Sequence, residues 1–68
     1  MIPIHYSVII QWSDEDQAFI AEVPELPGCS THGDTYEEVI KNAQEVIELW
    51  LVNAMATGKE IPPPRVAA

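Results

Sequence analysis

The sequence predicts an α+β domain, in which one long α-helix packs on one face of a small antiparallel β-sheet. Three observations predict it. Residues 4–12 place apolar or aromatic side chains at every second position, which is the period of a strand. Residues 36–57 repeat apolar side chains at helical spacing. Prolines and glycines separate these two patterns. A chain of 68 residues is expected to form a single domain, residues 1–68.

The first two strands are expected at about residues 3–12 and 18–23, joined as an antiparallel hairpin. The polar residues from Ser13 to Asp16 form the connection, which is longer than a two-residue turn. In the second strand Phe19, Ala21 and Val23 share one face, and that face is expected to be buried.

A proline-bracketed turn follows the second strand. Pro24 and Pro27 have no N–H to donate, so strand pairing must stop there. Gly28 then redirects the chain into a short third strand at about residues 29–32, which ends at Gly33.

The helix carries clear start and stop signals. Thr35 and Glu38 have the spacing of a capping box, and Gly58 is the expected C-terminal stop of a helix over residues 36–57. The tail, residues 59–68, contains three consecutive prolines and is expected to be extended. Its last residues are an optional fourth strand, which gives the order β-β-β-α(-β).

Apolar side chains exceed what one face of a small sheet can cover. The excess lies on the outer sheet face and on the widened apolar side of the helix. These apolar residues are either scattered over the surface, as is common in proteins, or they form a surface that binds a partner or another copy of the chain. We favour the second interpretation. The expected surface comprises Ile9, Ile20, Leu49, Leu51 and Val52, with the acidic hairpin residues Asp14, Glu15 and Asp16.

The composition limits the partners. Eleven acidic and three basic residues give a net charge of −8, which disfavours nucleic-acid binding and favours a basic partner. The single cysteine excludes an internal disulfide and fits a reducing compartment. No apolar run approaches the roughly 20 residues of a membrane helix. We therefore expect a cytoplasmic protein.

The sequence contains two candidate chemical sites. Cys29 and His32 have C-x-x-H spacing, but a zinc site needs three or four ligands and only His5 could join them. Residues three apart on one strand point to opposite faces, which argues against a Cys–His nucleophile. The acids form the second candidate, a metal-dependent nuclease cluster, although they fit a solvated surface better; they are Asp14, Glu15, Asp16, Glu22, Glu25, Asp34, Glu45 and Glu48. We expect no catalytic residue, metal or cofactor.

The segment VPELPGCSTHGDTYEEVIKNAQEVIELWL resembles the N-terminal domain of the HicB antitoxin family. Two blocks at fixed spacing carry the resemblance. They supply the signature residues Pro24, Leu26, Pro27, Gly28, Cys29, Gly33, Asp34, Thr35 and Glu38. The resemblance implies a partial RNase H-like fold without its catalytic carboxylates. It also implies an antitoxin that neutralises a small basic RNA-cleaving toxin of the HicA type.

Family members commonly form dimers or tetramers, and full-length members carry a C-terminal DNA-binding domain. The sequence ends at Ala68, so we expect no direct DNA binding. The hairpin has Gln17 and Ala18 where the family usually has a glycine, which suggests a different turn. A stand-alone oligomeric regulatory domain without a toxin remains the alternative.

Overall fold

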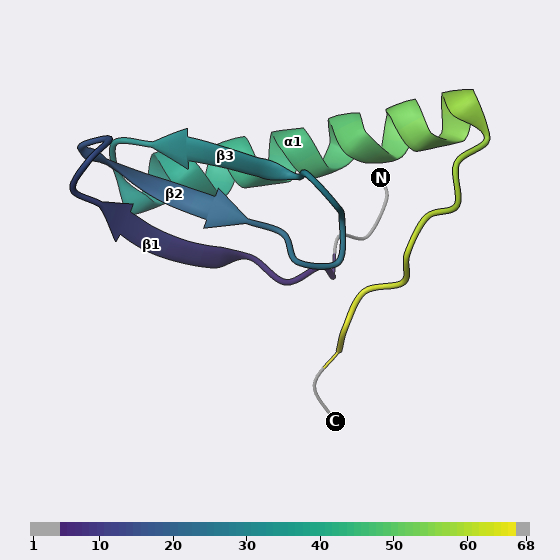
Figure 1. Ribbon diagram of the computed structural model, residues 1–68, viewed down its shortest axis with the longest axis horizontal. Coiled ribbons are helices and arrows are strands. Elements are labelled where there is room, and N and C mark those ends of the chain that lie inside the picture. Colours follow the sequence, from purple (N-terminus) through teal and green to yellow (C-terminus); the bar gives the residue numbers. More distant parts are fainter. Residues whose placement is uncertain (1–4, 67–68) are drawn as a thin grey trace.

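The computed structural model describes residues 5–66 and confirms the α+β prediction. Strands β1 (Ile9–Ser13), β2 (Ala18–Glu22) and β3 (Ser30–Gly33) form an antiparallel sheet in the order β1-β2-β3. Helix α1 (Tyr36–Thr57) lies across one face of the sheet (Figure 1). Within residues 5–66 the tail forms no fourth strand and runs extended after the helix.

Strand β1 is shorter than predicted. It begins at Ile9, which pairs with Glu22. Extending this register would place Ser7 opposite Pro24, which has no N–H for a ladder hydrogen bond. The strand therefore starts later than the alternating pattern suggests, and the first part of the predicted range, residues 3 and 4, lies outside the described residues.

The β1–β2 hairpin has a four-residue turn, Asp14 to Gln17, as its polar composition suggested. Gln17 adopts a left-handed backbone with φ of 53°, which is the conformation that favours glycine. Its amide Nε2 donates a hydrogen bond to the Asp14 carbonyl oxygen at 2.6 Å. This side-chain contact accompanies a backbone conformation that residues other than glycine rarely adopt.

The turn between β2 and β3 closes on itself through backbone hydrogen bonds. The Val23 N–H donates to the Cys29 carbonyl at 3.0 Å, and the Leu26 N–H donates to the Val23 carbonyl at 3.1 Å. Gly28 takes the positive φ that reverses the chain. Strand β3 begins at Ser30, one residue later than predicted.

Both helix ends match the sequence signals. The Thr35 hydroxyl accepts a hydrogen bond from the Glu38 N–H at 3.1 Å, and Gly58 ends the helix with φ of 70°. Gly33 is required by the close approach of strand and helix. A Cβ at this position would lie 2.6 Å from the Val39 backbone nitrogen.

The inward stripe of α1 forms most of the core. Its buried residues are Val39, Ala43, Ile47, Leu51 and Ala54. Ile47 and Leu51 pack with Val23, Leu26 and Cys29, whereas Val39 and Ala43 pack with Ala21 of β2. Leu51 is only 5% exposed, so its predicted place on a partner surface is wrong.

Candidate interaction surface

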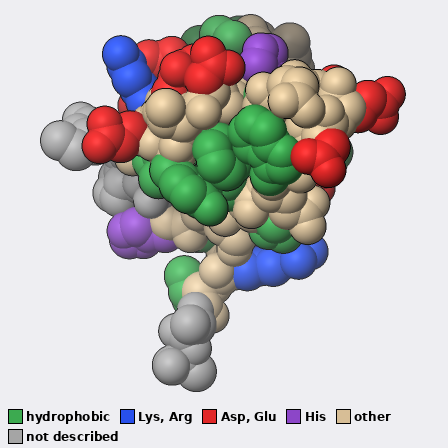
Figure 2. Space-filling model, turned by 90° about the vertical axis from the view of Figure 1, so that its left-hand side faces the viewer, with side chains coloured by type: hydrophobic (Ala, Val, Ile, Leu, Met, Phe, Trp, Pro, Cys, Tyr) green, Lys and Arg blue, Asp and Glu red, His purple; other side chains and the backbone are tan. Residues whose placement is uncertain are grey.

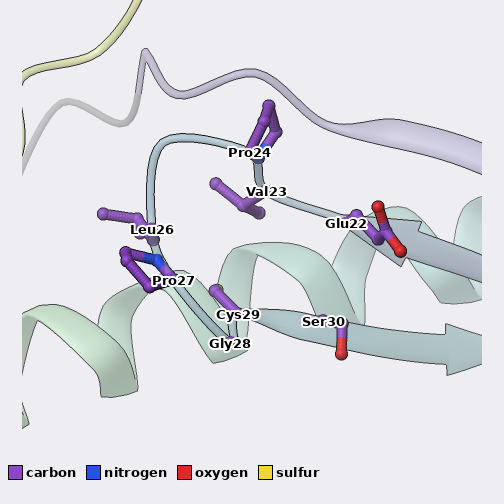
Figure 3. A pocket seen from close by; sticks show the side chains of 8 residues that line it. All are labelled: Glu22, Val23, Pro24, Leu26, Pro27, Gly28, Cys29 and Ser30. Atoms are coloured by element: carbon purple, nitrogen blue, oxygen red, sulfur yellow. The ribbon is translucent and has the colours of Figure 1, made fainter.

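The Pro24–Gly28 turn covers the C-terminal half of α1. Leu26, at its centre, is almost fully buried, and the Trp50 indole N–H donates to the Pro27 carbonyl at 3.1 Å. A hollow of about 310 Å³ opens beside this turn, with Glu22 and Ser30 among its lining residues (Figure 3). Glu22 is the only carboxylate in the lining, so the hollow lacks the converging acids of a catalytic centre.

Cys29 and His32 do not form a site. Cys29 is buried in the core, and burial raises the pKa of its thiol, which disfavours the reactive thiolate. His32 lies on β3 with an exposed side chain, while its backbone carbonyl accepts a hydrogen bond from Asn42. Across residues 5–66, no three His, Cys, Asp or Glu side chains are grouped to hold a metal ion.

Glu25 is an exception among the acids. The sequence placed it with the solvated surface, but it is only 6% exposed. Its carboxylate accepts hydrogen bonds from the Ser7 N–H at 3.0 and 3.2 Å, from the Ser7 hydroxyl at 3.0 Å and from the Arg65 N–H at 2.9 Å. One side chain thus joins the β2–β3 turn to the segment before β1 and to the tail.

The hydrogen bonds keep this buried carboxylate ionised. Burial alone raises the pKa of Glu25, but donation from the backbone of Arg65, Ser7 and Glu25 itself, and from the Ser7 hydroxyl, lowers it to about 2. No periodic pattern identifies Glu25, because its partners are 18 and 40 residues away. Its place inside the P-E-L-P-G-C block was the only available signal.

The predicted partner residues lie on the sheet, on the helix and in the hairpin turn. Ile9 and Ile20 share the sheet face opposite the helix, and Leu49 and Val52 lie exposed on α1. The three acids of the hairpin turn are exposed beyond the end of β1. Asp16 and Ile20 line one hollow of about 310 Å³, whereas Leu49 and Val52 lie on the helix, so the predicted residues do not all form one surface.

An apolar cluster at one end of the molecule is open to solvent, and Phe19, which was expected to be buried, is only partly buried in it. Trp12 packs edge-to-face on Phe19 with ring centroids 5.0 Å apart, and Phe19 packs on Tyr36 at 4.3 Å. Trp12 is 49% exposed, Tyr36 62% and Ile40, one helical turn further, 45%. Helix α1 packs mainly on β2 and β3, so the inward face of β1 has little cover. We call Trp12, Phe19, Tyr36 and Ile40 the aromatic patch.

Comparison with known proteins identifies relatives across most of the chain. A UPF0150 protein of Synechocystis sp. is 36% identical over 58 residues, which cover 85% of this chain and 72% of the relative. One from Thermoplasma acidophilum is 39% identical over 57 residues, covering 84% and 81%. One from Thermotoga maritima is 39% identical over 49 residues, covering 72% and 65%.

No solved structure matches, so the likeness to RNase H stays a prediction. No helix within the described residues is long and apolar enough to cross a membrane. The family described as the HicB-like antitoxin of bacterial toxin–antitoxin systems matches residues 6–68. The chain therefore belongs to the HicB-like antitoxin family.

Proposed function

We propose that this protein is a non-catalytic antitoxin that neutralises a cognate basic, RNA-cleaving toxin of the HicA type by direct contact. Family membership over residues 6–68 carries the proposal. The net charge of −8 supports it, because opposite charges steer association and raise the rate of encounter with a basic protein. We place this contact in the cytoplasm, where such a toxin would find its RNA.

The same charge makes direct DNA binding by this chain unfavourable, since both surfaces would be negative. Exposed apolar residues on the sheet face, Ile9 and the partly exposed Ile20, give a separate surface on which a dimer or tetramer can form. This surface also favours the second candidate function, a stand-alone oligomeric regulatory domain that has no toxin partner.

Co-expression tests the proposal. The gene next to this one is cloned alone and together with this protein, and growth and RNA cleavage are scored. We expect a small basic neighbour that arrests growth alone, loses its RNA cleavage when co-expressed and co-purifies with this chain. A neighbour that stays fully toxic despite expression of this protein contradicts the proposal and leaves the regulatory alternative.

A further inference from the structure

We propose that the aromatic patch is the surface that receives the basic partner. This inference rests on the proposed function and names the place of contact on this chain. Trp12 and Tyr36 are large, about half exposed and held in place by Phe19 between them. Tryptophan and tyrosine are the residues that most often dominate the binding energy of protein interfaces.

The patch is preorganised. The Trp12 indole N–H donates to the Asp14 carboxylate at 2.8 Å, which fixes the ring against the hairpin turn. Tyr36 and Ile40 lie one turn apart at the start of α1, so they form neighbouring parts of one helix surface. Fixed side chains lose little conformational freedom when a partner binds, which favours affinity.

Acidic side chains are concentrated at the same end of the molecule. Figure 2 shows an exposed hydrophobic area with carboxylates around it, on the side where the β1–β2 turn and the start of α1 lie in Figure 1. We call the exposed acids of these two segments the acidic rim; they are Asp14, Glu15, Asp16, Asp34, Glu37 and Glu38. Lys41 is the only cation in the same part of the helix.

The aromatic patch and the acidic rim together favour a partner protein that carries positive charge. Lysine and arginine side chains of a basic protein can pair with the acidic rim, and an arginine can stack on the exposed Trp12 or Tyr36 ring. A second copy of this chain would bring carboxylates of the same sign to the contact, which is unfavourable. The patch therefore fits a basic protein surface with apolar or guanidinium groups at its centre.

The test compares two matched double variants by isothermal titration with the purified basic neighbour. Tyr36→Ser/Ile40→Ser removes patch side chains, and Leu49→Ser/Val52→Ser removes equally exposed side chains elsewhere on the helix. We expect the patch variant to weaken binding by at least about tenfold and the control to stay within about twofold. Circular dichroism confirms that both are folded.

Two further pairs of variants test the patch independently and test the contribution of the acidic rim. Ile40→Arg adds a cation in the patch and Val52→Arg adds one outside it, and only the first is expected to weaken binding. Asp14→Asn/Glu37→Gln should slow association and reduce its salt dependence, whereas Glu45→Gln/Glu48→Gln should not.

The outcomes separate the two proposals. If wild-type protein does not bind the neighbour, the proposed function fails, and this inference fails with it. If wild-type protein binds and the patch variants bind equally well, only the inference fails. If the patch variants change the molar mass by light scattering while toxin binding stays unchanged, the patch receives a second copy of this chain, and the inference is wrong.

Discussion

The two halves of helix α1 both bury apolar side chains, but they differ in what covers them. In the C-terminal half, Ile47 and Leu51 are buried beneath the β2–β3 turn. In the N-terminal half, Val39 and Ala43 are buried against β2, but Tyr36 and Ile40 beside them remain 62% and 45% exposed. The difference shows that covering segments, rather than the helix pattern, decide which apolar residues become core.

The covered half is sealed by three chain segments. The β2–β3 turn supplies Leu26, and the segment before β1 supplies Tyr6, whose hydroxyl donates to the Pro62 carbonyl of the tail at 2.7 Å. Glu25 holds the other two segments to the turn through Ser7 and Arg65. In the open half, Val39 and Ala43 pack on Ala21 of β2, whereas Tyr36 and Ile40 beside them remain exposed and stay available to a partner.

The largest effect is expected from truncating the covered half. Leu26→Ala should lower the free energy of unfolding by about 2–5 kcal/mol, because it leaves a cavity beneath the turn. Ile40→Ala, in the open half, removes a side chain that is already half exposed and should cost less than about 1.5 kcal/mol. Urea denaturation of both variants checks the contrast. Equal losses would mean that the open half is as well packed as the covered half.

A smaller effect is expected from Glu25→Gln, which keeps the shape but removes the charge. One of its two acceptor oxygens becomes an amide nitrogen facing backbone N–H donors, so the free energy of unfolding should fall by about 1–3 kcal/mol. Hydrogen exchange should rise at the Ser7 and Arg65 amides in particular. Glu45→Gln on the exposed side of α1 is the control. A similar loss of unfolding free energy in that variant would argue against a specific role of the Glu25 hydrogen bonds.

Acid should weaken the same contacts. The pKa of Glu25 is about 2 in the folded protein against an ordinary value of 4.5, so the folded state favours the ionised form. Its contribution is fully present above pH 4.5 and is lost as pH falls from there toward 2. Denaturation curves between these pH values should show a weaker pH dependence in Glu25→Gln. An unchanged slope would show that other carboxyl groups control acid unfolding.

The smallest effect is expected at the open end, in the hairpin turn. Gln17→Gly relieves a left-handed backbone and should raise the free energy of unfolding by up to about 1 kcal/mol, reduced by the loss of the side-chain bond to Asp14. Gln17→Ala loses that bond but keeps the strain, so it should be destabilising. Melting temperatures of the two variants, measured by thermal denaturation, test both expectations. A more stable alanine variant would contradict the strain argument.

Local features of the fold were predictable from the sequence. Thr35 and Gly58 define the two ends of α1, because capping depends on residues close in the chain. The start of β1 was not predictable from alternation, since it depends on the proline opposite.

The candidate surfaces were harder to predict. The burial of Glu25 depends on Arg65, 40 residues away, and the exposure of Trp12 depends on where the helix crosses the sheet. Three-dimensional packing determines both, and a single sequence does not encode it as a local pattern.

The hydrogen bonds that join Glu25 to Ser7 and Arg65 also have a consequence for chain connectivity. Ser7 and Arg65 bind the same carboxylate although they are 58 positions apart, so the beginning and end of the described chain meet at one point. A circularly permuted protein, opened in the exposed turn after Ser13 and with a linker joining the segment of Arg65 to that of Ser7, should therefore fold to the same core. In such a protein the new termini would lie beside the aromatic patch, where a label or fusion could report directly on its occupancy.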